Sequence, residues 1–507
     1  MHGVTAYVFL ADRSPQTDAA LTGFPVDDAW IHLVYGRSLA QHGVPAFNDS
    51  TLEAGFSSPA WIAVTGGAHL LAHDPRTVVL LVKIAGVLAA LLGSVAIARL
   101  CHHLTGAHWP GLYAGALAGL TSFLAFAQVS GMEPLLAGAL ALWALVAALR
   151  RKPATAGALL AAAYLARPET LVLAPCLVLP FVLRSGAAPA STRRGPALLR
   201  LLLPVVLAAA AWALYCLAAT GRPLPNTYYV KSVGQQFLAG SWVILRNIVW
   251  ELPCNWLGSG AILFALGLFA LWRSRRSEAL PVVLFPFVFL LALAATRPMP
   301  PDAGVSFYFL RYAVPGLLPL FVPIAIGAAA LVGGLGGRRL LAQRGAAVLL
   351  VAGTLVAVPQ GVRDWSWLFS WSCQNINEVQ VEVGKWLREH TPPEAGVAVI
   401  DAGAARYFGE RRTTDLLGLN DHRLAQDPGA RFAIVVGGDV EVLLAVMQRD
   451  EASHLVIFPK MLPGLLGQDA FRRHFEPVAE FVSPHYVATR FPPQDTLAIY
   501  RLRTGPA

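Results

Sequence analysis

Two adjacent carboxylates, Asp27 and Asp28, stand near the start of the chain, immediately before a stretch with helical spacing. Adjacent carboxylates can share a proton or bind a metal ion, and one of them can act as a general base. The structural alternative is an N-capping aspartate followed by a favourable acidic first turn. On either interpretation the pair marks the beginning of an amphipathic helix.

Four charged residues interrupt long apolar runs further along the chain. Glu133 directly precedes a proline, Arg167 and Glu169 flank another, and Arg311 begins a later apolar run. Ionisable groups at membrane depth are costly and usually mark a functional cavity. The alternative is a side chain that reaches the headgroups, or a structural ion pair.

The segment 223–231 concentrates groups that bind through hydrogen bonds and charge. It contains the amide of Asn226, the phenols of Tyr228 and Tyr229, and the cation of Lys231. These types suit a phosphate or a sugar. The alternative is an interfacial aromatic belt with a lysine reaching towards the headgroups.

The composition indicates that a lipid bilayer surrounds most of these residues. Of 507 residues, 56% are hydrophobic and only 14% are charged, against about 25% charged in an average soluble protein. These values exclude a disordered chain and a coiled coil. The net charge of +9 comes mostly from basic clusters between apolar runs, which is the positive-inside pattern. We therefore expect membrane lipids, and no nucleic acid, around the chain.

Apolar runs of about 20 residues predict membrane-spanning helices. They lie near residues 57–72, 77–100, 109–127, 132–150, 154–167, 169–184, 198–219, 256–272, 279–296, 307–333 and 341–360. The predicted fold class is a polytopic α-helical membrane protein with about 10–12 transmembrane helices.

Basic clusters set the predicted orientation. The clusters assigned to the cytoplasm are residues 150–152, 185–197, 273–278 and 334–344. The four charged residues of the apolar runs, the segment 221–255 and everything after residue 360 then face outward.

The acidic segment 24–56 is also expected outside, with Trp30 and Val34 touching the membrane interface. A crossing should precede this segment, but residues 1–23 contain only a short apolar piece. This predicts a translation start upstream of Met1.

The composition changes after residue 373, which predicts two domains, a transmembrane one over 1–373 and an extracytoplasmic α/β one over 374–507. A helix is expected over 378–390 and a short one after Asp401. The expected strands are 397–400, 432–436, 454–458 and 496–501.

Several short motifs occur in a fixed order along most of the chain. They are Asp27-Asp28-Ala-Trp-Ile, Phe47-Asn48, Ser57-Ser58-Pro59-x-Trp61, Gly131-Met132-Glu133, Arg167-Pro168-Glu169, Leu224-Pro225-Asn226-Thr227-Tyr228-Tyr229-x-Lys231, Arg311-Tyr312-x-x-Pro315, Trp386-Leu387-Arg388, Asp401-Ala-Gly-Ala404 and Asp415-Leu-x-Gly-Leu419. Together they resemble the GT-C superfamily of integral-membrane glycosyltransferases. The likeness is to bacterial members similar to the mycobacterial terminal arabinofuranosyltransferase and to mannosyltransferase-like relatives.

The resemblance implies transfer of a hexosyl or pentosyl group from a polyprenyl-phosphate donor to a glycan, lipid or protein acceptor. The reaction would take place with inversion, on the outer face of the cytoplasmic (inner) membrane. Asp27 is the implied general base, with Asp28 orienting it or taking that role. The residues implied to stabilise the departing phosphate are Lys231, Arg167 and Arg311. Those implied to hold sugar or phosphate are Asn226, Tyr228 and Tyr229, with Glu133 and Glu169 positioning the cations.

Two other functions fit the same pattern of spans and charges. One is a transporter or flippase of lipid-linked saccharides, and the other is a non-catalytic relative. Relatives differ in their use of a divalent cation such as Mg, Mn or Ca, and two carboxylates alone do not decide the matter. No residue is assigned as a metal ligand.

Overall fold

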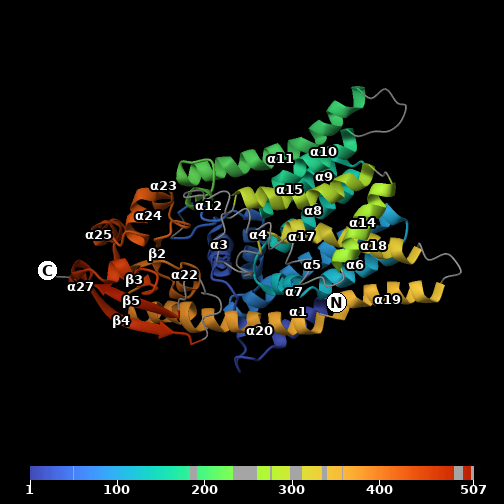
Figure 1. The fold of residues 1–507 in the computed structure, drawn as a ribbon. Helices are drawn as coiled ribbons and strands as arrows, with labels where there is room; N and C mark the ends of the chain where they lie inside the picture. Colours follow the sequence, from blue (N-terminus) through green and yellow to red (C-terminus); the bar gives the residue numbers. More distant parts are fainter. Residues whose placement is uncertain are drawn as a thin grey trace. The chain divides into compact units, whose positions relative to one another are not determined.

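Figure 1 shows the computed structural model with its helices and strands labelled. The chain divides into two compact units that interleave along the sequence. The residues described are 1–48, 51–182, 191–231, 260–274, 277–296, 311–333, 340–356, 358–484 and 495–503. Unit 1 comprises Met1–Phe9, Lys83–Ala211 and Gln235–Ser366, and unit 2 comprises Leu10–Val82, Trp212–Gly234 and Trp367–Ala507. The expected boundary after residue 373 stays a prediction.

Unit 1 is helical throughout the part that the structure describes. Its helices are α1 (His2–Ala11), α5 (Pro75–Thr105), α6 (Trp109–Leu120), α7 (Ser122–Val129), α8 (Pro134–Leu149), α9 (Pro153–Ala166), η1 (Pro168–Leu173), α10 (Ala174–Val182), α11 (Ser191–Thr220), α14 (Gly260–Ser274), η3 (Ser277–Ala279), α15 (Leu280–Thr296), α17 (Val314–Leu317), η4 (Leu318–Leu320), α18 (Phe321–Gly333), α19 (Leu340–Val356) and α20 (Val358–Ile376). The ends of α1, α5, α11 and α20 run into unit 2.

Three helical stretches among the described residues are long and apolar enough to cross a membrane. They are Pro75–Thr105, Gly195–Thr220 and Val314–Val332. The pair α6 and α7 is a fourth candidate, bent by 67°. Shorter apolar helices occupy most of the other predicted stretches, so the predicted polytopic helical class is confirmed. The number of 10–12 spans stays a prediction.

Prolines set the helix boundaries that position two of the charged residues. Pro134 is the first residue of α8, where its missing N–H costs nothing, so Glu133 becomes the preceding cap residue. Arg167 precedes Pro168 and has an extended backbone, as expected of a residue before proline, and this ends α9 at Ala166.

Unit 2 contains a five-stranded sheet and the helices around it. The strands are β1 (Gly396–Val399), β2 (Arg412–Asp415), β3 (Ala452–Ile457), β4 (Phe475–Val482) and β5 (Thr496–Leu502). The order is β2-β1-β3-β5-β4, in which β1 pairs parallel with β2 and β3, and β5 pairs antiparallel with β3 and β4. The predicted C-terminal α/β character is thus confirmed.

Helices and short turns complete unit 2. They are α2 (Ala19–Thr22), α3 (Asp28–His42), α4 (Pro59–Leu71), α12 (Asn226–Lys231), η5 (Asn377–Val381), α21 (Glu382–His390), α22 (Ala404–Gly409), α23 (His422–Gln426), α24 (Pro428–Val435), α25 (Val440–Arg449), α26 (Pro463–Leu466) and α27 (Asp469–His474). The predicted strand 432–436 is wrong, because Asp427 caps and Pro428 begins the helix α24. Strands β2 and β4 were not predicted.

Helices α14 and α18 of unit 1 approach each other through glycines. A Cβ atom on Gly327 would lie 1.8 Å from the Leu263 carbonyl oxygen, and one on Gly267 would lie 1.8 Å from that of Pro323. Small residues permit this close backbone contact, which is typical of helix pairs in membranes.

We expect Gly327→Ala to destabilise the protein by about 1–3 kcal/mol, because the added methyl group forces the two helices apart. Thermal unfolding of the purified protein in detergent measures the effect. Gly195→Ala is the matched control, since a Cβ there meets no atom within 4 Å. Equal unfolding temperatures for the two variants would contradict the expected close contact.

Candidate active site

Asp27 is buried, and its carboxylate binds the beginning of helix α22. Oδ2 accepts a hydrogen bond from the Gly403 N–H at 2.6 Å, and Oδ1 accepts one from the Ala404 N–H at 2.7 Å. These amides are among those that a helix leaves unpaired at its first turn. Asp27 precedes α3 but makes no side-chain cap to it. It therefore binds the beginning of a helix 376 residues away in the sequence instead of capping its own.

A second carboxyl group, that of Asp401, follows strand β1, is half-buried and lies near Asp27. The Asp401 carboxylate accepts a hydrogen bond from Gln380 Nε2 at 2.8 Å. Burial, and then the neighbouring Asp401, raise the pKa of Asp27 well above its usual range, while the two amides partly offset this. Burial also raises the pKa of Asp401. Asp401 belongs to the motif Asp401-Ala-Gly-Ala404, whereas no sequence motif contains Gln380.

Asp28 is the first residue of α3 and is only partly buried. Its charge acts on Asp401, so it lies close to the carboxyl pair. The predicted acidic pair thus divides into a buried Asp27, which binds two amides, and a more accessible Asp28. The expectation that Trp30 and Val34 touch the membrane interface is wrong, because both are buried inside unit 2.

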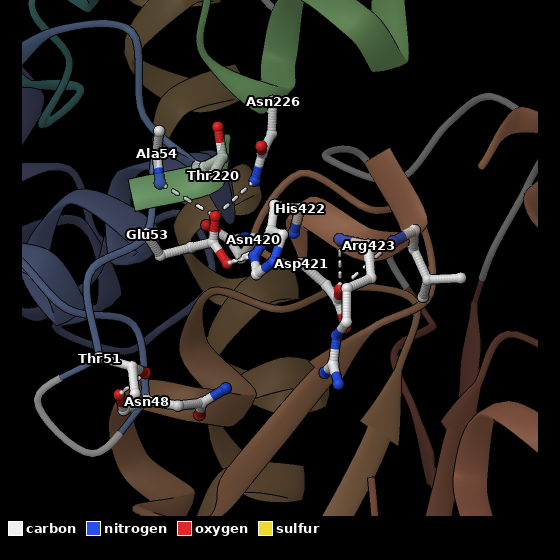
Figure 2. A network of polar contacts seen from close by, with 12 residues as sticks. Asn48, Thr51, Glu53, Ala54, Thr220, Asn226, Asn420, Asp421, His422 and Arg423 are labelled. Atoms are coloured by element: carbon white, nitrogen blue, oxygen red, sulfur yellow. Dashed lines mark hydrogen bonds and ion pairs between the residues drawn. The ribbon is translucent and has the colours of Figure 1, made fainter. Parts of the chain in front are cut away.

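The same segment is bound a second time through Glu53, whose carboxylate is surrounded by hydrogen-bond donors (Figure 2). Oε1 accepts from Asn226 Nδ2 at 2.9 Å and from the Ala54 N–H at 3.0 Å. Oε2 accepts from His422 Nδ1 at 2.9 Å. This hydrogen bond raises the pKa of His422. Neither Glu53 nor His422 was predicted, and their separation of 369 residues leaves no local signal.

A third set of contacts surrounds the buried carboxylate of Asp415, at the end of β2. It accepts hydrogen bonds from the Leu417 N–H and from the backbone and side-chain amides of Asn420. Asn420 in turn accepts from the Tyr35 hydroxyl at 3.1 Å. Burial raises the pKa of Asp415 to about 7. The carboxyl ends of β1 and β2 therefore both bind the acidic N-terminal segment.

The predicted binding residues of α12 differ in how deeply they are buried. Asn226 is buried and donates to Glu53 and to the Leu419 carbonyl oxygen, so its amide hydrogens already bind other parts of the protein. The Tyr228 side chain is exposed, and the ring of Tyr229 lies under the Arg222 guanidinium at 5.4 Å. Lys231 ends the helix and is half-buried.

The other four predicted residues gather in unit 1. Arg167 Nη1 lies 3.4 Å from Glu133 Oε1, and Arg167 Nε lies 3.6 Å from Glu169 Oε2. Arg167 also donates to the backbone carbonyl of Arg311 at 3.3 Å. Both guanidinium groups lie near the ring of Tyr312, at 4.6 Å for Arg167 and 5.1 Å for Arg311. Glu133, Arg167 and Arg311 are buried, so the charged cluster belongs to the interior.

Unit 1 also contains a buried lysine that was not singled out from the sequence. Lys83 lies within the spanning helix α5 and is 1% exposed. The sequence alone could have singled out Lys83, because a lysine inside a long apolar run is uncommon and usually functional.

The residues described offer no preformed metal site at the acidic pair. Both oxygens of Asp27 already accept backbone hydrogen bonds. No three histidine, cysteine, aspartate or glutamate side chains in the described ranges are grouped as a metal ion would need. The use of a divalent cation stays a prediction, and no described residue is assigned as a ligand.

A family model described as a domain of unknown function (DUF8728) matches residues 374–500. No curated protein matches the chain. Among solved structures, the chain is similar to the ArnT protein of Cupriavidus metallidurans in the apo state, with a TM-score of 0.61 and 12% identity over 99% of this chain and 97% of that one. The same protein bound to undecaprenyl phosphate gives a TM-score of 0.53 and 13% identity over 100% and 98%.

A third similar structure is the oligosaccharyltransferase AglB of Archaeoglobus fulgidus, in complex with an inhibitory peptide and a dolichol phosphate. Its TM-score is 0.60, with 12% identity over 95% of this chain and 72% of that chain. ArnT and AglB are both GT-C glycosyltransferases. The fold is GT-C-like. The fold expected from the resemblance is therefore confirmed.

We expect Gly403→Ala to break the contact between Asp27 and α22 in this GT-C-like fold. A Cβ on Gly403 would lie 2.2 Å from the Asp27 carbonyl oxygen and 2.5 Å from Oδ2. Because hydrogen bonds to charged groups contribute about 1.5–3 kcal/mol each, a loss of about 2 kcal/mol or more is expected in the free energy of unfolding. Tryptophan fluorescence reports it, since Trp30 packs on Phe408 of α22. Gly464→Ala, where a Cβ meets nothing within 4 Å, is the control and should unfold like the wild type.

The hydrogen bond between His422 and Glu53 predicts a pH-dependent contribution to stability. Since the folded state raises the His422 pKa, this contribution is present at low pH and is lost as the pH rises through the raised value. His422→Asn places an amide N–H near the position of Nδ1 without the titration. We expect the wild type to be more stable than this variant only at low pH, by about 1 kcal/mol or less, because the His422 side chain is 36% exposed. A stability difference that is constant with pH would contradict the assignment.

Proposed function

We propose that this protein is a glycosyltransferase that moves a sugar from a polyprenyl-phosphate donor to an acceptor on the outer face of the inner membrane. The observation that carries the proposal is an acidic pair with one accessible and one fixed carboxyl group, in a GT-C-like fold. Support for the donor comes from two similar structures, one with undecaprenyl phosphate and one with dolichol phosphate. The basic clusters between apolar runs support the orientation.

The chemistry assigned to the acidic pair is deprotonation of the acceptor. The acceptor hydroxyl attacks the anomeric carbon, a new C–O bond forms, and the bond to the phosphate oxygen breaks with inversion. The phosphate leaves with the bonding electrons, and the hydroxyl proton passes to a carboxylate. We assign this base role to Asp28, because Asp27 is buried and its oxygens accept two backbone hydrogen bonds. Asp27 then holds the first turn of α3.

The charged cluster of unit 1 is assigned to the phosphate of the lipid carrier. Arg167 interacts with Glu133 and Glu169, which fix its guanidinium and offset its charge. Arg311 brings a second buried guanidinium to the same cluster. A guanidinium can form bidentate hydrogen bonds to two phosphate oxygens. We therefore assign Arg311 the larger share in stabilising the departing phosphate.

The residues of α12 are assigned to the sugar and its carrier. Tyr228 presents an exposed ring and hydroxyl, and Tyr229 and Lys231 lie on the same short helix. A hexosyl or pentosyl group offers hydroxyls to these donors and acceptors. Asn226 supports the helix through Glu53, so its contribution is to hold α12 in place.

The first test is sugar transfer in membranes that contain the protein, with a panel of polyprenyl-phosphate sugars. We expect Asp28→Asn to lower the rate by about 10²–10⁴-fold, the usual contribution of a general base, without lowering the unfolding temperature. Asp27→Asn should lower the unfolding temperature as well, because it disturbs a buried contact with two amides.

Asp18→Asn is the control, since it removes an exposed carboxylate from the same N-terminal region. It should transfer sugar at the wild-type rate. Full activity in a stable Asp28→Asn variant would overturn the base assignment. No transfer by the wild type from any donor, with the protein folded and lipid-bound, would favour transport or a non-catalytic role.

A further inference from the structure

We propose that Glu53 is a positioning residue that sets where the binding helix α12 lies, and that His422 fixes Glu53 from the C-terminal region. Glu53 thus determines the place of the phenols and the cation of α12, although it belongs to the acidic segment. What α12 binds rests on the proposed function, whereas the fixing of α12 by Glu53 does not. All the residues involved lie in unit 2.

Helix α12 needs a support from outside, because it has only six residues. A helix this short is not stable on its own. It follows the spanning helix α11 after residues 221–225, which include Pro223 and Pro225. Proline restricts the backbone of this link but donates no hydrogen bond. The contacts that fix α12 must therefore come largely from its own residues.

Asn226, the first residue of α12, makes such contacts. It is 0% exposed, and its Nδ2 donates to Glu53 Oε1 at 2.9 Å and to the Leu419 carbonyl oxygen at 3.2 Å. Its backbone N–H donates to the Ala54 carbonyl oxygen at 2.9 Å. Both partners of Nδ2 are acceptors, so the amide group cannot turn over without bringing its own oxygen against them. The beginning of α12 therefore has one orientation, which Glu53 helps to set.

The carboxylate of Glu53 is itself fixed by donors from several segments (Figure 2). Oε1 also accepts from the Ala54 N–H at 3.0 Å. Oε2 accepts from Nδ1 of His422 at 2.9 Å and from the backbone N–H of the same residue at 3.3 Å. The carbonyl oxygen of Glu53 accepts from the Tyr215 hydroxyl of α11 at 2.9 Å. Glu53 is buried, and a buried carboxylate is stable only when it is bonded in this way.

Helix α23, which carries His422, is bound to the same junction at both of its ends. At its beginning, the Asp421 side chain accepts from two backbone amides of the helix. At its end, Gln426 Nε2 donates to the carbonyl oxygen of Thr220, the last residue of α11, at 2.7 Å. His422 is therefore presented to Glu53 by a helix that cannot move independently of the end of α11.

The residues assigned to the donor follow Asn226 closely. Tyr228, Tyr229 and Lys231 come two, three and five positions after it, so a displacement of the helix start moves all of them together. A displacement of about 1 Å in a positioning group can cost on the order of 10²-fold in rate. Because these residues are assigned to binding, loss of their position should appear in the KM for the donor and much less in kcat.

The test is Asn226→Asp, alone and together with Glu53→Gln. In the single variant a second carboxylate faces Glu53 where a donor stood, so a hydrogen bond is lost and two like charges repel. The double variant exchanges the acid and the amide, so a donor and an acceptor face each other again. We expect the single variant to raise the donor KM by about 10–100-fold, as for one hydrogen bond to a charged group. The double variant should recover about tenfold of this loss, with kcat within about threefold throughout.

Hydrogen exchange measured by mass spectrometry supplies a readout that needs no activity. Amides of residues 226–231 should exchange at least about tenfold faster in Asn226→Asp and in Glu53→Ala, and more slowly again in the double variant. His422→Ala should accelerate them less, because Asn226 keeps its acceptor. Strand β3 should be unchanged in every variant, which separates a local release of α12 from global unfolding. Glu476→Ala is the control, since it removes the carboxylate of an ion pair with Arg501 in the sheet.

Each result decides one part of the assignment. Unchanged exchange of residues 226–231 in Glu53→Ala, or no recovery in the double variant, overturns the positioning role of Glu53. Unchanged exchange in His422→Ala overturns the role of His422. Calorimetric titration with undecaprenyl phosphate in detergent provides the affinity if no transfer is observed. Faster exchange with unchanged KM and unchanged affinity for this lipid leaves Glu53 as the residue that fixes α12, and overturns the proposed role of α12 in donor binding instead.

Discussion

The carboxylate of Asp27, held by two backbone amides at the beginning of α22, is the contact on which the acidic segment depends. A buried carboxylate is tolerated only when its oxygens are well bonded, and these two amides, otherwise unpaired at a helix terminus, meet that need. The contact fixes the start of α3 and lets Trp30 pack on Tyr407 and Phe408 of α22. The segment that carries the proposed base is thus built together with the C-terminal sheet, in one compact unit.

Local patterns predicted the helices well and the site only in part. Apolar runs and prolines such as Pro134 and Pro168 act over a few residues, so their effect can be read along the chain. Strand β2 has the polar sequence Arg-Thr-Thr-Asp, so no apolar pattern predicts it. These residues form a strand because they pair with β1. The apolar composition of residues 432–436 predicts a strand. Most of them belong instead to helix α24, which Asp427 caps and Pro428 begins.

The site follows the same division between local and distant causes. Asp27, Glu133, Arg167 and Arg311 can be singled out from the sequence, since charge beside apolar sequence is informative on its own, and their roles stay predictions. Which carboxylate is accessible was not predictable, because it depends on Gly403 and Ala404, about 376 residues away. The contact between Glu53 and His422 could not be predicted for the same reason. A single buried contact between two distant segments produces no recognisable pattern in the sequence of either segment.

Asn48 has a further consequence for the sheet. Strand β2 is an outer strand, with β1 on only one side. The Asn48 side chain donates to the Thr413 carbonyl oxygen at 2.8 Å and accepts from the Thr413 N–H at 2.9 Å, as a neighbouring strand would. An uncovered sheet edge is a template for association with another chain. The acidic segment therefore also covers this edge of the sheet at Thr413, and a chain that fails to fold this segment would leave the β2 edge open to pairing with another chain.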